Sequence, residues 1–293
     1  MKHNTIKYLS ALLLFGTNGI VASQISLPSY QIVFLRALLG SGLLWLLFFW
    51  GNYKRQATQH LQQVLYILIS GAAMGASWMF LYEAYQQIGV SIASMLYYVG
   101  PVIVMVLSPL LFHEKLTANK CFAFIVVLCG VLCINGGQTA ISFNRWGIFC
   151  GGISALLYAV MVIANKKATH IAGLENASIQ LFTSFLTVAI FVGYKTGYSF
   201  TVAPDDWLWI FLLGFLNTGI GCYLYFSAIG TLSVQTVAIC GYLEPASAVI
   251  FSMLLLQETM QPLQIIGAVL ILGGAIFGEI SPQAVAKKQL QKK

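Results

Sequence analysis

One carboxylate, Glu244, lies inside a long apolar stretch and is the first candidate for chemistry in this chain. It stands about ten residues into the segment 234–256, so a helix rising 1.5 Å per residue would place it ~15 Å deep, near the centre of a bilayer. An ionisable group at that depth costs about 2.5–3.5 kcal/mol and usually faces a cavity. Gly241 and Ala248 form a small-residue stripe on the same helix face. Two interpretations stay open for Glu244: it binds a proton or a cationic group of a substrate, or it is a protonated structural side chain bonded to a neighbouring helix.

Arg36 is the second candidate, because it is the basic residue that lies deepest within an apolar segment. Asn18 and Arg36 are about equally far from the turn between the first two segments, so they should stand at the same depth, ~10 Å below the outer surface. Glu83, at the outer end of the third segment, is a candidate ion partner for Arg36. Two interpretations stay open for Arg36: a structural side chain that reaches toward the interface, or a residue that binds substrate or closes a gate.

The third segment carries a face of small and aromatic residues. Gly71, Gly75, Trp78, Tyr82 and Tyr85 follow one another at spacings of four, three, four and three, which places them on one side of a helix. The two glycines predict close helix packing. The rings either anchor the helix at the lipid interface or line a ligand pocket, and Trp78 lies deeper than an interface residue should.

Further polar side chains occur at membrane depth in other segments, and together they predict a cavity with an amphipathic aromatic lining. Tyr97 and Tyr98 belong to this group. The substrate-binding residues predicted from the sequence are Glu244, Trp78, Tyr82, Tyr158, Asn18, Arg36, Asn217, Tyr223 and Tyr242. We predict no catalytic residue and no metal site, since the six cysteines lie mostly in apolar runs without accompanying histidines or carboxylates.

The elements that must position these residues are membrane helices. Of the 293 residues, 59% are hydrophobic and only 8% are charged, against about 25% charge in a soluble domain. The apolar runs are continuous, which favours helices over the alternating pattern of a membrane barrel. Ten segments can be marked, at about 6–25, 29–50, 61–82, 91–112, 120–137, 145–165, 176–194, 206–226, 234–256 and 263–281. The signal-peptide-like start is interpreted as a retained first span.

The second half of the chain repeats the first at a constant shift of 144 residues. Residues 84–114 align without a gap on residues 228–258, pairing Pro101 with Pro245 and Glu114 with Glu258. An odd number of spans per half means that the second copy must insert upside down. The predicted fold is an all-α membrane protein with ten transmembrane helices in two inverted five-helix repeats, residues 1–138 and 145–282, followed by a basic cytoplasmic tail, residues 283–293.

The basic residues support this topology through the positive-inside rule. With the N-terminus in the cytoplasm, only Arg145 and Lys195 fall on the outer side, and both termini are cytoplasmic. The inner side receives Lys2, Lys7, Lys54, Arg55, Lys115, Lys120, Lys166, Lys167, Lys287, Lys288, Lys292 and Lys293. Inverted halves suit alternating access around a site near the midplane. Glu114 and Glu258 are expected to cap or hold loops.

The two copies, residues 92–117 and 237–260, and the Gly-rich span after each resemble the EamA-like family of the drug/metabolite transporter superfamily. The resemblance covers nearly the whole chain. It implies a carrier for amino acids, their derivatives or other small metabolites, usually outward and coupled to a proton or other ion gradient. One departure is that Gly100 occupies the position that Glu244 has in the second copy. The first helix also lacks the glutamate that the superfamily's small multidrug exporters use.

The sequence therefore predicts a secondary active transporter that exports an amino acid or derivative across the cytoplasmic membrane. The alternative is uptake of choline or another quaternary amine, because aromatic rings bind such cations. An intramembrane enzyme is not expected, since HExxH, GxSxG and paired intramembrane aspartates are lacking. A receptor or assembly factor without transport activity is a further alternative. The expected partners are a small-molecule substrate and the bilayer, without nucleic acid or cofactor but with proton or sodium coupling, in a monomer or homodimer.

Overall fold

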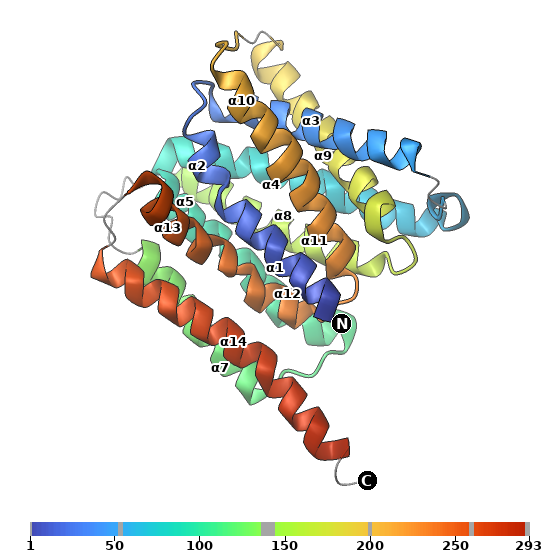
Figure 1. Cartoon of the computed structure of the whole chain (residues 1–293), viewed down its shortest axis with the longest axis vertical. Coiled ribbons are helices and arrows are strands. Elements are labelled where there is room, and N and C mark those ends of the chain that lie inside the picture. Colours follow the sequence, from blue (N-terminus) through green and yellow to red (C-terminus); the bar gives the residue numbers. More distant parts are fainter. Residues whose placement is uncertain (1, 52–54, 136–143, 199–200, 258–260, 291–293) are drawn as a thin grey trace.

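The protein is a bundle of helices joined by short turns (Figure 1). The computed structural model describes residues 2–51, 55–135, 144–198, 201–257 and 261–290, and no β-strand occurs among them. The helices are α1 (Lys2–Gly16), α2 (Asn18–Ala22), α3 (Ser29–Trp50), η1 (Ala57–Gln59), α4 (Leu61–Ile88), α5 (Val90–Tyr97), α6 (Val99–Phe112), α7 (Ala118–Asn135), α8 (Arg145–Lys167), α9 (Gly173–Thr196), α10 (Asp206–Phe211), η2 (Leu212–Ile220), α11 (Gly221–Ile229), α12 (Val234–Gly241), α13 (Leu243–Leu256) and α14 (Pro262–Leu290).

Eight helical stretches of the described chain are long and apolar enough to cross a membrane. They are His3–Ala22, Ser29–Trp50, Leu61–Ile88, Ile92–Phe112, Arg145–Lys167, Gly173–Lys195, Asp206–Ile229 and Val234–Leu255. The fifth and tenth predicted segments correspond to shorter apolar helices, Ala118–Ile134 and Pro262–Gly278. The chain is thus all-helical with several membrane-length spans, whereas the count of ten stays a prediction.

Small residues allow the helices to pack closely. The predicted close packing at Gly71 and Gly75 is confirmed, because α4 lies directly against α9 there. A Cβ atom on Gly71 would lie 2.5 Å from the Gln180 carbonyl oxygen, and one on Gly75 would lie 2.6 Å from the Ser184 carbonyl oxygen. The opposite edge of the bundle is formed by α7 and α14, which lie side by side in Figure 1.

The two copies of the repeat are interrupted at the same place, where the sequence predicted continuous segments. The first copy breaks between α5 and α6 at Tyr98, and the second between α12 and α13 at Tyr242, which is 144 residues later. The physical reason is a proline three residues further on, Pro101 or Pro245, whose ring nitrogen cannot donate to the carbonyl one turn earlier. Glu244 stands two residues after the second break.

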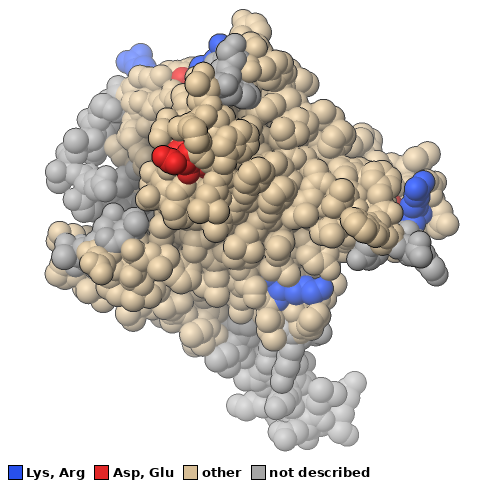
Figure 2. All heavy atoms as spheres, turned by 45° about the horizontal axis from the view of Figure 1, so that its top comes forward, with Lys and Arg blue, Asp and Glu red and all other residues tan. Residues whose placement is uncertain are grey.

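Exposed charge lies mainly toward the ends of the bundle, whereas Arg36 and Glu244 lie inside it. Figure 2 shows a broad, mostly uncharged surface with Lys and Arg side chains toward its edges and a group of Asp or Glu side chains. The start of α1 and the end of α14 lie at the same end of the bundle in Figure 1. Helix α14 continues to Leu290, so most of the predicted tail is helical. Lys54, residues 136–143 at the predicted join, Glu258 and residues 291–293 lie outside the described residues.

Candidate functional site

A cavity of about 680 Å³ extends into the bundle from one end. Its walls come from both halves of the chain, namely from α1 to α5, α8, α11, α12 and α13. It begins at exposed residues on the α2 and α5 ends of the bundle, among them Gly19, Ser23 and Val90, and reaches the buried side chains of Cys222 and Phe226. The structure brings six of the predicted binding residues to this cavity, which are Asn18, Arg36, Trp78, Tyr82, Tyr158 and Glu244.

Glu244 is the acidic side chain of the cavity and lies in the first turn of α13. Within the described part of the chain, no hydrogen bond or ion pair engages its carboxylate. Around it the cavity is lined by tyrosine rings, those of Tyr85, Tyr97, Tyr98 and Tyr158. The carboxylate is therefore available to a ligand inside an otherwise aromatic wall.

Arg36 is the basic side chain of the cavity and is held on two sides. Its Nε donates a 2.8 Å hydrogen bond to Thr218 Oγ1, and its guanidinium carbon lies 5.1 Å from the centre of a Trp78 ring. Thr218 Oγ1 in turn donates a 2.8 Å bond to the Leu213 carbonyl oxygen. Among the described residues, the two terminal nitrogens of Arg36 have no protein acceptor. A guanidinium fixed in this way presents a free edge with the geometry that a carboxylate binds through two parallel hydrogen bonds.

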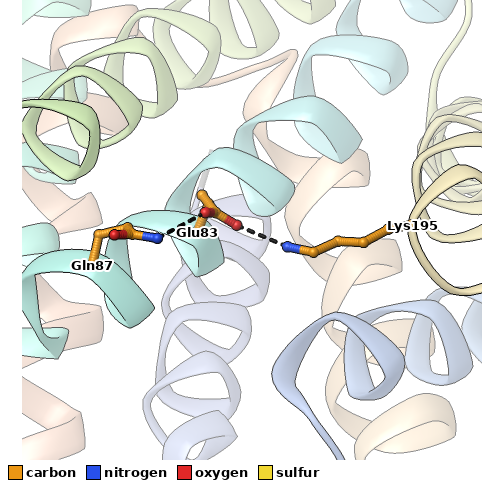
Figure 3. Close-up of polar contacts among 3 residues, drawn as sticks. All are labelled: Glu83, Gln87 and Lys195. Atoms are coloured by element: carbon orange, nitrogen blue, oxygen red, sulfur yellow. Dashed lines mark hydrogen bonds and ion pairs between the residues drawn. The ribbon is translucent and has the colours of Figure 1, made fainter.

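The expected ion pair between Arg36 and Glu83 is wrong. Glu83 Oε2 lies 2.9 Å from Lys195 Nζ on α9, and Gln87 Nε2 donates to Glu83 Oε1 at 3.1 Å (Figure 3). This is the one ion pair within the described residues, and it lies at the mouth end of the bundle. The two opposite charges of the cavity, Arg36 and Glu244, are consequently not neutralised by salt bridges within the described chain.

The three other predicted binding residues do not line the cavity. Asn217 is buried beside it, where its Nδ2 lies 3.0 Å from Asn18 Oδ1 and 2.8 Å from Thr17 Oγ1. Tyr223 lies near the start of α1, with Lys7 Nζ 5.7 Å from its ring centre. Tyr242 is fully buried at the helix break, where its hydroxyl donates a 2.6 Å bond to the Tyr98 carbonyl oxygen. All three interact with neighbouring helices outside the cavity, and Asn217 supports Asn18, which lines the cavity wall.

Besides Tyr97 and Tyr98, two tyrosines of the cavity were absent from the predicted binding set although the sequence offered a signal for them. Tyr85 continues the helix face of Trp78 and Tyr82, for which the lipid interface and a ligand pocket were both open. Tyr225 lies seven residues after Thr218 and three after Cys222, on one helix face, and its ring centre is 5.2 Å from that of Tyr8. Groups of three or more His, Cys, Asp or Glu side chains that could hold a metal are lacking in the described ranges.

The end of the bundle opposite to the mouth is closed by polar contacts on the turn between α11 and α12. Glu114 accepts hydrogen bonds from the backbone N–H groups of Val234 at 2.8 Å and Gln235 at 3.2 Å, which confirms its predicted capping role. Lys166 Nζ donates to the three carbonyl oxygens of the turn, those of Ile229, Gly230 and Leu232. Tyr8 ties α1 to the same region through a 2.8 Å hydrogen bond to the Val237 carbonyl oxygen.

The chain matches known transporters along nearly its whole length. The EamA-like transporter family matches residues 6–136 and 145–278. YxxF, an uncharacterized transporter of Bacillus subtilis (strain 168), is 26% identical over 287 residues, covering 96% of this chain and 91% of its own. The pseudopaline exporter CntI of Pseudomonas aeruginosa (strain UCBPP-PA14) is 26% identical over 257 residues, 86% of either chain.

A protein of known crystal structure has the same fold. It superposes with a TM-score of 0.80 at 18% identity, covering 94% of this chain and 98% of its own. The sequence family agrees with the apolar helices and the cavity between them. This chain therefore belongs to the EamA-like transporter family, and it is a multi-pass membrane transporter, not an enzyme.

Proposed function

We propose that the protein is a secondary active transporter for an amino acid or a related zwitterion. The observation that carries this proposal is the presence of one unpaired acid, Glu244, and one unpaired guanidinium edge, Arg36, in the same cavity. A ligand with only one charge would leave the other group buried and unbalanced, which is costly in a low-dielectric site. A zwitterion offers a carboxylate to Arg36 and an ammonium to Glu244.

The aromatic walls would hold the uncharged body of the substrate. Trp78 and Tyr82 lie on the α4 face of the cavity, while Tyr158 projects from α8 and Asn18 from α2. A cavity of about 680 Å³ is within the usual range for small-molecule sites, so it has room for an amino acid with a sizeable side chain. One chain supplies all of these walls, so a monomer would suffice for transport, and a homodimer would hold two separate sites.

The same geometry supports alternating access. Lys195 and Arg145 lie at the mouth end, whereas Lys166, Lys167 and Lys7 lie at the closed end, so the positive-inside rule favours an extracellular mouth. In our proposal both termini are cytoplasmic, the two halves are inverted five-helix repeats, and this conformation faces outward. Opening of the closed end would require release of the α11–α12 turn.

The direction of transport and the coupling ion complete the proposal. Export across the cytoplasmic membrane is favoured by the name of the pseudopaline exporter, which describes that relative. Coupling to protons would use Glu244, whose carboxylate would bind either the substrate ammonium or, at lower pH, a proton. Uptake of choline is the second candidate, because the tyrosine rings around Glu244 would suit a quaternary ammonium.

Flux through the purified protein in liposomes tests the proposal. The substrates to compare are a panel of amino acids, the amines formed from them by decarboxylation, and choline. We expect counterflow with at least one amino acid, weaker counterflow with the matching amine, and none with choline. Counterflow with choline or amines alone would overturn the zwitterion assignment, and vesicles that stay sealed to every compound would favour a non-transporting role.

A further inference from the structure

The helix opposite Arg36 contains an irregular segment that brings a threonine to it. Residues Leu212–Ile220 are π-helical, with Thr218 fully buried inside this segment. The Thr218 hydroxyl donates to the Leu213 carbonyl oxygen, five residues earlier. In a regular helix such a hydroxyl bonds three or four residues back, as Thr187 does to the Thr183 carbonyl oxygen in α9. π-Helical turns are rare and occur frequently at functional sites.

The direction of this hydrogen bond determines what Thr218 offers to Arg36. A hydroxyl has one proton, and here it points to the Leu213 carbonyl oxygen. The remaining lone pairs can only accept, and Arg36 Nε donates to them at 2.8 Å. Because Nε is bound and Trp78 covers one face of the guanidinium, the plane of the group is fixed and the edge with both terminal nitrogens stays free.

The contact between Arg36 and Thr218 is short because α3 and the π-helical segment η2 pack closely together. A Cβ atom on Gly40 of α3 would lie 3.0 Å from the Gly214 carbonyl oxygen and 3.0 Å from Thr218 Cγ2. The glycine therefore lets the π-helical segment come within hydrogen-bond distance of Arg36, which is one helical turn before it on α3. The irregular backbone, the glycine and the threonine all converge on one guanidinium.

We infer that Thr218 is a positioning residue that gives the cavity its preference for substrates with a carboxylate, by holding the Arg36 guanidinium in the orientation that binds one. The inference rests on the proposed function and adds to it the residue that sets substrate class. Without an acceptor at position 218, the guanidinium would keep its charge but rotate away from the carboxylate or take several orientations. Substrate binding would then have to restrict it to one orientation, and this entropic cost would weaken the affinity.

The test measures the binding of an amino acid and of its decarboxylated amine to purified protein, by titration calorimetry. Thr218→Val removes the acceptor, Thr218→Ser keeps it, and Thr218→Cys matches the size of serine but accepts weakly. We expect Val and Cys to weaken amino-acid binding about 10-fold or more, the usual effect of losing a hydrogen bond to a charged group. Ser should stay within about threefold of wild type, and amine binding should not change in any variant. Thr187→Val is the matched control, and we expect it to change neither affinity.

The outcomes separate this inference from the proposed function. Wild-type protein that does not prefer the amino acid over the amine would refute the zwitterion site itself. If wild type shows the preference and Arg36→Gln abolishes it, but Thr218→Val and Thr218→Cys retain it, Thr218 is not the positioning residue. Equal loss of amine and amino-acid binding in the Cys variant would also overturn the inference, because it would indicate a general structural effect. Should the Val variant fail to fold, the comparison of Ser with Cys decides alone.

Discussion

Replacement of Glu244 by glutamine tests the acidic half of the proposed site most directly. Gln has the same shape as Glu and removes only the negative charge. Because no hydrogen bond or ion pair engages the Glu244 carboxylate among the described residues, the substitution breaks no internal contact. We therefore expect the free energy of unfolding to stay within about 1 kcal/mol of wild type, as for other substitutions that leave packing intact.

The expected loss of binding is much larger than this change in stability. A hydrogen bond to a charged group contributes about 1.5–3 kcal/mol, which corresponds to about 10- to 150-fold in Kd. Glu244 stands within the bilayer region of the fold, where the low dielectric strengthens charge interactions, so we expect an effect in the upper part of this range. Amino-acid binding should weaken accordingly, and amine binding should weaken at least as much.

Binding and counterflow should be measured between about pH 5 and 9, with Glu83→Gln as the matched control. Glu83 pairs with Lys195 and does not line the cavity, so its variant should bind within about twofold of wild type. Wild-type affinity should fall as the pH drops, because a protonated carboxyl cannot pair with an ammonium, whereas Glu244→Gln should lack this dependence. Unchanged affinity and unchanged pH dependence in Glu244→Gln would remove this residue from the mechanism.

Three further predictions concern the scaffold around the site. Gly40→Val should destabilise the protein by about 1–3 kcal/mol through overpacking against η2, measured by thermal unfolding in detergent. Gly42 has no atom close to the place of a Cβ, so Gly42→Val should cost under about 1 kcal/mol. Equal effects of the two substitutions would contradict the packing argument. Glu114→Ala should lower stability by about 1–3 kcal/mol in the same assay because two backbone N–H groups lose their acceptors. An unchanged melting temperature would rule out a stabilising role for this cap. Lys195→Met should change stability by less than about 1 kcal/mol, because the Lys195–Glu83 pair is partly exposed. Substrate binding should stay unchanged, since neither residue lines the cavity, and a clear loss of binding would place this pair in the site.

The class of fold and the polar groups of the cavity could be predicted because the chain has so few charges. Each charge inside an apolar run is costly, so Glu244 and Arg36 were visible from the sequence as functional candidates. The same reasoning could not find the partners of Arg36. Which side of one helix faces which side of another depends on rotation and register, and for this reason Glu83 was wrongly paired with Arg36 while Thr218 was overlooked.

Helix interruptions were harder to predict than helices. The sequence predicted continuous segments around Pro101 and Pro245, but the helices are interrupted three residues before each proline, at Tyr98 and Tyr242. The π-helical turn before Thr218 has no proline and no other simple sequence signal. The sequence also could not tell whether a buried amide at membrane depth lines a cavity or supports a residue that does. Asn217 is of the second kind, because it lies beside Asn18 outside the cavity wall.

The two helix breaks, at Tyr98 and Tyr242, differ in the residue that follows them. Gly100 and Glu244 occupy equivalent positions, each two residues after its tyrosine. Position 100 has no space for a charged side chain, because even a Cβ atom there would lie 2.7 Å from the Tyr158 ring. The two equivalent positions therefore have different roles: Gly100 packs against the ring of Tyr158, which lines the cavity, and Glu244 supplies the acid. Substitutions meant to change the substrate should consequently be placed near the second break, while the first is left intact.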